Sequence, residues 1–362
     1  MKKRNVLYAL LLVLFLLAAF PASPSKAEAE VLSAGDMTGD GITTAADAAC
    51  ILRGIADSSL NGESRPDLDF TQNGEIDGTD VRAALLYACG GISDWVTFGE
   101  RVSSGLCDER LFDRFSYTGT QNDGTGNYKS ENVSINIITN RAGSSNYHYA
   151  DIYIQDLSCF VTAFSNEKYL GIGESVRKMF EATPGAIVAM NGDFYSIHVF
   201  GPVIRNGVTY EDHVTKDWDI AVLRSSGELA TYEYRTLTKE ELTGLDAYQT
   251  WVFGPVLLDE NGHAKTEFRS HVQSANPRSV LGYYEPGHYA FLTVDGRSNE
   301  SEGMTTKELS QLCEDLGFTK AFNLDGGQSS VLMVQNGAVN VPFRGGRSVS
   351  DIMAIRELPA GE

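Results

Sequence analysis

A duplicated, aspartate-rich pattern near the N-terminus constrains the fold of this chain more than any other feature. One copy occupies residues 36–47 and the other occupies residues 69–80. Both copies have oxygen-bearing side chains at positions 1, 3, 5, 9 and 12 and a glycine at position 6. Apolar residues with i, i+3, i+4, i+7 spacing follow each copy, and this spacing predicts a helix after each loop.

The two loops have the composition of EF-hand calcium loops. Ca²⁺ takes roughly six to eight oxygen ligands, and the glycine permits the sharp turn that directs them inward. We expect two calcium ions, one in each loop. The expected ligands are Asp36, Thr38, Asp40, the Ile42 carbonyl and Asp47 in the first loop, and Asp69, Thr71, Asn73, the Glu75 carbonyl and Asp80 in the second.

This duplicated half EF-hand, at about residues 30–92, resembles a dockerin. The resemblance implies a small all-α calcium-binding module. It also implies a partner, the cohesin domain of a cellulosome-type scaffold protein. Loop positions 10 and 11 differ between the copies (Ala45 and Ala46 against Gly78 and Thr79), which leaves the cohesin type open. The alternative is a calcium-stabilised spacer that has no partner.

Residues 1–29 have the pattern of a secretory signal peptide. A basic start (Lys2, Lys3 and Arg4) precedes the apolar run Val6–Phe20, and Ala27-Glu28-Ala29 fits a cleavage site. The run is shorter than the roughly 20 residues of a membrane span. We therefore expect a secreted protein, extracellular or held on a cell-surface scaffold, with no membrane span after cleavage. The net charge of −19 argues against a nucleic-acid partner.

The C-terminal part of the chain mixes strand and helix patterns. Residues 133–138, 151–154 and 186–190 read as strands, and residues 174–183 read as a helix. A capping box at Thr305 predicts a second helix, which ends at Gly317. Hairpin turns are predicted at the two Asn-Gly pairs, residues 206–207 and 336–337. We expect an α/β domain, a mixed sheet with helices, over residues 131–362, preceded by a linker or lead-in at residues 93–130.

Polar motifs follow or precede the predicted strands. They are Asn191–Tyr195, Asn276–Ser279, Val294–Ser298 and Asn323–Ser330. The last motif contains a carboxylate and two glycines, which let a backbone approach an anion closely. Arginine suits phosphate because its guanidinium donates two parallel hydrogen bonds. Cleavage at a sugar–phosphate junction requires a carboxylate, an arginine and a glycine-rich loop, and these motifs contain all three.

The candidate site residues come from these motifs and from the C-terminal tail. The predicted catalytic residues are Asp325, Asp193, Arg297 and Arg278. The predicted substrate-binding residues are Asn191, Asp295, Asn323, Gly326, Gly327, Ser329, Ser330 and Arg347. No cofactor pattern is evident in this domain.

The order of these motifs resembles the phosphodiester glycosidases. The matching segments are NGDFY at 191–195, NPRSVLG at 276–282, DGRS at 295–298, NLDGGQSS at 323–330 and GGRSVSDIMAI at 345–355. The resemblance implies a hydrolase that cleaves a sugar-1-phosphodiester at the C1–O bond and releases free sugar and a phosphomonoester. At positions 328, 346 and 193 this chain has Gln328, Gly346 and Asp193, where other residues are frequent in the family. These differences affect the substrate contacts that the resemblance implies.

Two other readings of this domain stay open. One is a glycosidase that acts on a non-phosphorylated polysaccharide. The other is a non-catalytic glycan-binding domain that the dockerin-like module displays.

Overall fold

The computed structural model describes residues 35–60, 65–70, 74–90, 92, 105–196, 201–215 and 217–358. The chain divides between Ser103 and Ser104 into two compact units. The expected signal peptide and the expected calcium ligands Thr71 and Asn73 lie outside the described residues. Within the described ranges, no helix is both long enough and apolar enough to cross a bilayer.

Unit 1 contains the helices that the sequence predicts after its loops, α2 (Ala45–Ala56) and α3 (Gly78–Ala88), with the 3₁₀ turn η1 (Pro66–Leu68) between them. Both helices start inside the twelve-residue pattern because its last residue closes a capping box. Asp47 accepts from the Thr44 N–H, and Asp80 accepts from the Asp77 N–H. Both aspartates are fully buried.

The sequence repeat is also a repeat of hydrogen bonds. Asp36 accepts from the Gly41 N–H at 2.7 Å, and its equivalent Asp69 accepts from the Gly74 N–H at 2.8 Å. Asp47 accepts from the Met37 N–H at 2.9 Å. Asp80 accepts in the same way from the Phe70 N–H at 2.7 Å. Carboxylates at loop positions 1 and 12 therefore fold each loop in the same manner.

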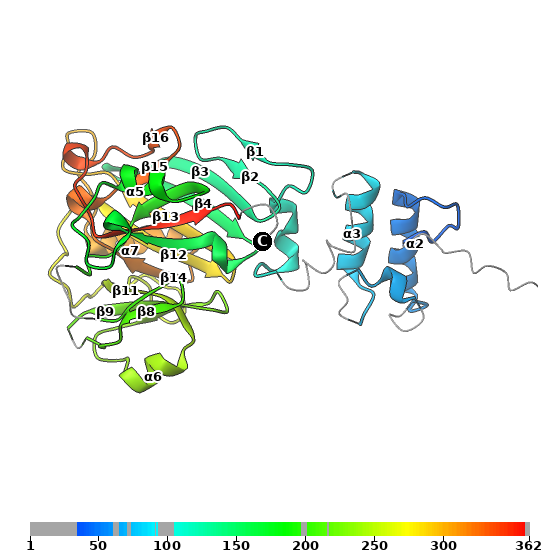
Figure 1. Cartoon of the computed structure of the whole chain (residues 1–362), viewed down its shortest axis with the longest axis horizontal. Coiled ribbons are helices and arrows are strands. Elements are labelled where there is room, and N and C mark those ends of the chain that lie inside the picture. Colours follow the sequence, from blue (N-terminus) through cyan, green and yellow to red (C-terminus); the bar gives the residue numbers. More distant parts are fainter. Residues whose placement is uncertain are drawn as a thin grey trace, which may run out of the picture. The chain divides into compact units, whose positions relative to one another are not determined.

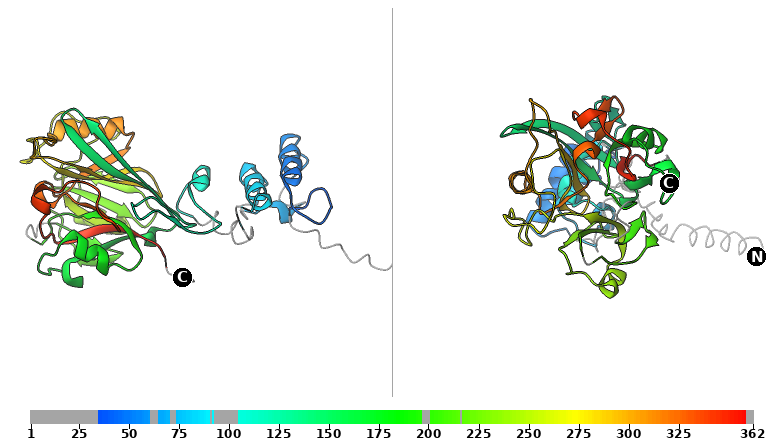
Figure 2. Two further views of the ribbon diagram at one scale, coloured as in Figure 1. Left: turned by 90° about the horizontal axis from the view of Figure 1, so that it is seen from above. Right: turned by 90° about the vertical axis from the view of Figure 1, so that its left-hand side faces the viewer.

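Unit 2 is dominated by antiparallel sheets (Figures 1 and 2). The seven-stranded sheet has the order β1 (Gln121–Asn122), β2 (Tyr128–Lys129), β3 (Val133–Ala142), β4 (Ser145–Ile154), β13 (His288–Val294), β12 (Arg278–Glu285) and β14 (Lys320–Asn323). The five-stranded sheet has the order β16 (Gly337–Ala338), β15 (Leu332–Val334), β6 (Ala186–Asn191), β17 (Asp351–Arg356) and β5 (Phe160–Phe164).

The main core lies between these two sheets. Alternate residues such as Leu281 of β12 and Val188 of β6 meet there, because successive side chains of a strand point to opposite faces. On the outer face of the five-stranded sheet, α5 (Val176–Ala182) packs with Ile352. On the outer face of the seven-stranded sheet, α7 (Thr306–Asp315) packs with Val280. The order of layers is thus helix, sheet, sheet, helix, which agrees with an α/β domain that has few helices.

A smaller layer completes the unit (Figure 1). Its three-stranded sheet has the order β10 (Leu229–Tyr232), β9 (Asp219–Arg224) and β11 (Ala247–Phe253), and α6 (Lys239–Gly244) packs on it through Leu242. The hairpin β7 (Val203–Arg205) and β8 (Val208–Glu211) turns at Asn206-Gly207, as the sequence predicts.

The predicted lead-in differs from the structure at its C-terminal end. Residues 105–130 belong to unit 2 and include the 3₁₀ helix η2 (Glu109–Arg114). Phe112 in this helix is fully buried, so burial of apolar side chains holds the segment on the unit. Residues 93–104 lie outside the described residues.

Candidate active site

The strand register brings the four polar motifs together. Arg278 at the start of β12 pairs with Val294 at the end of β13, and Val280 pairs with Asn323 at the end of β14. Three motifs therefore lie at one end of the seven-stranded sheet. Asn191, at the end of β6 in the other sheet, joins them because it accepts from Ser279 Oγ at 2.8 Å and donates to the Asp325 carbonyl at 2.8 Å.

Asp325 has one engaged carboxylate oxygen and one without a protein partner. Its Oδ2 accepts from Ser329 Oγ at 2.5 Å and from Arg347 at 2.6 Å. Arg347 also donates to Ser329 Oγ at 2.5 Å and stacks over the Phe194 ring. No residue of the described chain donates to Oδ1. An oriented carboxylate with a free oxygen is suited to attack on carbon or to activation of water.

Two arginines beside the Gly326-Gly327 loop lack an acidic partner among the described residues. Arg278 is buried and donates only to main-chain carbonyls, those of Met304 and Ser274. Burial, and then the neighbouring charge of Arg297, lower the pKa of Arg278 to about 10, so it remains a cation at neutral pH. Arg297 donates to Asn276 Oδ1 and lies over the Phe343 ring. Among the described residues neither arginine forms an ion pair, which leaves positive charge for a bound anion.

Backbone geometry at two positions holds the site in this form. A Cβ atom on Gly326 would lie 2.7 Å from the Pro277 carbonyl oxygen, so only glycine allows this approach. Gly327 has a φ of +65°, and Arg297 has a φ of +60°, which is unfavourable for a residue with a side chain. Strained conformations of this kind cluster at functional sites.

Asp295 is engaged on both oxygens. Its Oδ2 lies 3.1 Å from His148 Nε2, and its Oδ1 accepts from the Val341 N–H at 2.9 Å and from Asn340 at 3.3 Å. His148 Nδ1 in turn lies 2.9 Å from Thr139 Oγ1. Asp295, His148 and Asn340 are buried, whereas Thr139 and Val341 are exposed. Because both of its oxygens are engaged, the structure favours a supporting role for Asp295 rather than substrate contact.

Asp193 lies in a different environment from the one that the sequence suggests. It is fully buried in an ion triad, 3.1 Å from Arg205, which also contacts Asp351 at 2.9 Å. Its second oxygen accepts from the Val252 N–H at 2.8 Å. Burial raises the pKa of Asp193, and Arg205 offsets part of that rise. The structure therefore favours a structural role for Asp193 over the predicted catalytic role.

The remaining predicted residues line the interior of the site. Asn191 is fully buried and organises the loops. Asn323 donates to the Gly254 carbonyl, and its Oδ1 has no hydrogen-bond partner among the described residues. Ser330 Oγ is likewise buried without a partner. Sequence patterns did not indicate His148, Asn340 or Phe343. His148 and Asn340 lie outside the quoted motifs, and Phe343 lies two residues before the motif that begins at Gly345.

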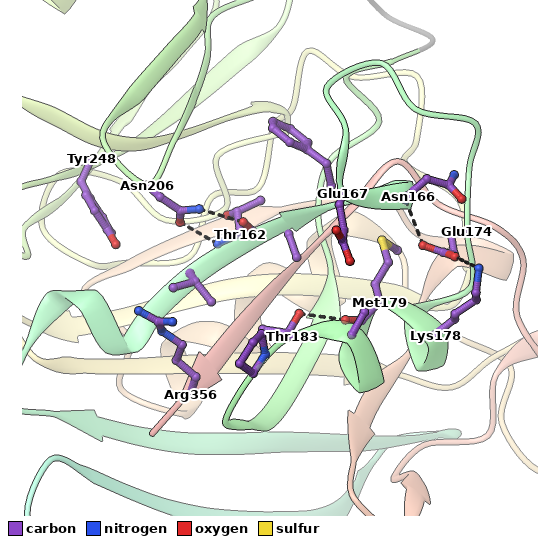
Figure 3. A pocket seen from close by; sticks show the side chains of 15 residues that line it. Thr162, Asn166, Glu167, Glu174, Lys178, Met179, Thr183, Asn206, Tyr248 and Arg356 are labelled. Carbon is purple, nitrogen blue, oxygen red and sulfur yellow. Dashed lines mark hydrogen bonds and ion pairs between the residues drawn. The ribbon is translucent and has the colours of Figure 1, made fainter. Parts of the chain in front are cut away.

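Figure 3 shows a cavity of about 710 Å³ that is separate from these residues. It lies along β5 and α5 and is lined by Thr162, Lys178, Tyr248 and Arg356 among others. The Asn206 amide bonds both to the N–H and to the carbonyl of Thr162, as a neighbouring strand would. None of the predicted site residues lines this cavity, so the candidate active site is at the strand ends.

The comparisons with known proteins concern the same unit of the chain. Residues 184–356 match the family model described as phosphodiester glycosidase. This part of the chain is similar to the phosphodiester glycosidases. The matched range contains every site residue predicted outside the calcium loops, and the match supports the prediction of a hydrolase.

Two relatives show how far the similarity extends. The SPbeta prophage-derived uncharacterized protein YomE of Bacillus subtilis is 28% identical over 162 residues, which are 43% of this chain and 25% of that protein. The chain thus spans about a quarter of that curated relative. The catalytic domain of zebrafish N-acetylglucosamine-1-phosphodiester alpha-N-acetylglucosaminidase, auto-inhibited by its pro-peptide, has a TM-score of 0.50 at 20% identity. The likeness covers 63% of this chain and 83% of that one, and it shows a shared sheet-dominated fold.

Proposed function

We propose that unit 2 hydrolyses a glycosyl phosphodiester to free sugar and a phosphomonoester. The observation that carries this proposal is the pair Arg278 and Arg297 beside the Gly326-Gly327 loop, two cations that pair with no acidic side chain in the described part of the chain. A buried cation without a counter-charge is costly, and a bound phosphate would supply that charge. Asp325 stands next to this loop with a free oxygen.

We propose distinct tasks for these groups. The arginines bind the phosphate and stabilise the negative charge that grows on it as the C1–O bond breaks. Asp325 Oδ1 either removes a proton from the attacking water or bonds to C1 itself, and in the second case water later releases the sugar. The bonding electrons leave with the phosphomonoester. Because a phosphate monoester is already a good leaving group, the step has little need of a separate general acid.

The direct test uses two synthetic substrates, an N-acetylglucosaminyl-1-phosphodiester and its glucosyl counterpart. The mature protein should release free sugar and phosphomonoester from at least one of them, and Asp325→Ala should not. A folded protein that binds these compounds without turnover would instead support the glycan-binding reading. Turnover of neutral glycans alone would support a glycosidase of non-phosphorylated polysaccharides.

For unit 1 we propose calcium binding and, through it, attachment to a cohesin-bearing scaffold outside the cell. The donor set fits calcium, because each loop offers carboxylate, threonine or amide, and main-chain oxygens. Asp36 and Asp69 accept equivalent hydrogen bonds, which supports the same conformation for both loops. In the described parts of the chain, no three His, Cys, Asp or Glu side chains form a metal-binding group. On this proposal, calcium would draw Asp36, Asp40 and Asp47 of the first loop together with Thr38 and the Ile42 carbonyl.

A further inference from the structure

His148 in β4 is a buried residue that the proposed reaction does not yet use. Its Nε2 lies 3.1 Å from Asp295 Oδ2, and its Nδ1 lies 2.9 Å from Thr139 Oγ1. Because an ionised carboxylate can only accept a hydrogen bond, Nε2 carries the hydrogen of the first contact. His148 pairs with Thr139 of β3 and with Thr293 of β13, and the three strands lie side by side (Figure 1). The imidazole is therefore held through both ring nitrogens, and it fixes the orientation of the Asp295 carboxylate.

The other oxygen of Asp295 holds the loop that follows β16. Its Oδ1 accepts from the Val341 N–H at 2.9 Å and from Asn340 at 3.3 Å. Asn340 is buried and also donates to the Ser330 carbonyl at 3.1 Å. One carboxylate thus joins the end of β13 to this loop and, through Asn340, to the glycine-rich motif. Because the two oxygens of a carboxylate move together, these contacts depend on the orientation that His148 sets.

The loop that begins at Val341 carries two groups of the candidate active site. Phe343 lies under the Arg297 guanidinium, with the ring centre 5.1 Å from the guanidinium carbon. Arg347 donates to Asp325 Oδ2 at 2.6 Å. The Val341 side chain itself is 71% exposed. The hydrogen bond of its N–H, and not burial of its side chain, therefore holds the start of this loop in place.

We infer that His148 is a positioning residue for the reaction, because it fixes the carboxylate that anchors the loop of Arg347. Through this loop it determines how Arg347 meets Asp325. The inference rests on the proposed function for the role of Asp325, but the anchoring of the loop can be measured without turnover.

Loss of the imidazole should affect Arg347 more than Arg297. Arg297 has contacts of its own, because its side chain donates to Asn276 Oδ1 at 2.9 Å and its N–H donates to the Glu302 carbonyl at 3.2 Å. The phosphate-binding arginine should therefore keep its place while the orientation of Asp325 is lost. This difference predicts a fall in kcat with little change in KM.

The first measurement is hydrogen exchange in the full-length mature protein, read by mass spectrometry on peptides that cover residues 339–347. His148→Asn removes the donor to Asp295 and should accelerate exchange in this loop by about tenfold or more. His288→Asn is the matched control and should not. His288 is also buried in the same sheet, at the other end of β13, and its Nε2 lies 2.7 Å from Asp151 Oδ1.

A second variant covers the case in which His148→Asn does not fold. Thr139→Val removes the other partner of the imidazole at an exposed position, so the fold should persist. It should accelerate exchange in the same loop by a smaller factor, about two- to fivefold. Thermal denaturation of each variant shows which of the two decides the test.

The second measurement is steady-state kinetics on the glycosyl phosphodiester. His148→Asn should lower kcat by about 10- to 100-fold, whereas KM and inhibition by inorganic phosphate should change by less than about threefold. His148→Gln should recover most of kcat, because its side-chain amide can donate to Asp295 in place of Nε2. His288→Asn should keep the wild-type kcat. A residue that serves folding alone would not separate kcat from KM in this way.

The two measurements separate this inference from the proposed function. Wild-type turnover with an unchanged kcat in His148→Asn overturns the inference and leaves the proposed function intact. Unchanged exchange of the loop overturns the inference whether or not the protein turns over substrate. Faster exchange without any wild-type turnover overturns the proposed function, and the anchoring of the loop by His148 stands.

Discussion

Arg347 donates a hydrogen bond to Asp325 Oδ2 at 2.6 Å, and it reaches Ser329 Oγ from the same guanidinium. These contacts fix the plane of the carboxylate and leave Oδ1 without a donor from the residues that the structure describes. Arg347 and Asp325 are separated by 22 residues, so the orientation of the carboxylate depends on the C-terminal tail and not only on the glycine-rich loop.

Asp325→Asn should abolish most of the activity while the fold persists. An amide neither accepts a proton from water nor attacks carbon, so we expect kcat to fall by about 10³-fold or more. KM should change little, because the arginines hold the phosphate. Steady-state kinetics on the glycosyl phosphodiester measure both. Asp315→Asn, an exposed residue of α7, is the matched control, and equal losses in the two variants would refute the role of Asp325.

Arg278→Met should weaken phosphate binding and leave the chemical environment of Asp325 unchanged. A charge-assisted contact of this kind contributes about 1.5–3 kcal/mol, so kcat/KM should fall by roughly 10- to 100-fold. Inhibition by inorganic phosphate should weaken in parallel. Arg177→Met removes an exposed arginine that pairs with Glu181 and should leave both quantities unchanged. Undiminished phosphate inhibition in Arg278→Met would contradict the assignment.

Local patterns predicted the elements that carry the site. The capping box at Thr305 and the turn at Gly317 mark the limits of α7, since both depend on residues within one turn of the helix end. The polar motifs do lie at strand ends. The second Asn-Gly pair was read less accurately, because Val334 pairs with Gly337 and the turn is formed by Gln335 and Asn336.

Local sequence patterns could not predict which charged side chains are buried. Asp193 stands in a motif that resembles a catalytic segment, but its role depends on Arg205 from β7 and on Asp351, which begins β17. Arg205 is 12 residues from Asp193 and 146 residues from Asp351 in the sequence. No periodicity links such positions, and only the packed sheets show that this carboxylate faces the interior. The three-stranded sheet was not predicted at all.

Gly326→Ala should impair the site through the backbone. The added Cβ would lie 2.7 Å from the Pro277 carbonyl oxygen, so the loop must shift away from Arg278. We expect a loss of about 1–3 kcal/mol in unfolding free energy and a larger relative loss of kcat/KM. Gly244→Ala is the control, because a Cβ there meets nothing within 4 Å. Thermal denaturation and kinetics of both variants measure the difference, and a fully active Gly326→Ala would show that the close approach is dispensable.

Calcium should stabilise unit 1. At a calcium concentration of about 100 times Kd, binding to the native state adds about 2.7 kcal/mol per site, so the melting temperature of this unit should rise. Asp36→Ala should remove much of that effect, whereas Asp57→Ala, outside the loop, should not. Calorimetric scans with calcium and with a chelator make the comparison. Identical scans would contradict calcium binding.

The triad of Asp193, Arg205 and Asp351 should make stability depend on pH. Two buried carboxylates share one cation, and burial raises the pKa of Asp351 to about 7 although Arg205 opposes the rise. The native state then holds a proton that the unfolded state releases near pH 4, so stability is lost as the pH rises through about 4 to 7.

Asp351→Asn mimics the protonated form and should flatten this dependence between about pH 4 and pH 7. Arg205→Met, in contrast, leaves two buried carboxylates without a cation and should cost about 3–5 kcal/mol. Melting temperatures across the pH range test both variants. A wild type and an Asp351→Asn variant with parallel profiles would mean that Asp351 stays ionised, and that Arg205 balances both carboxylates on its own.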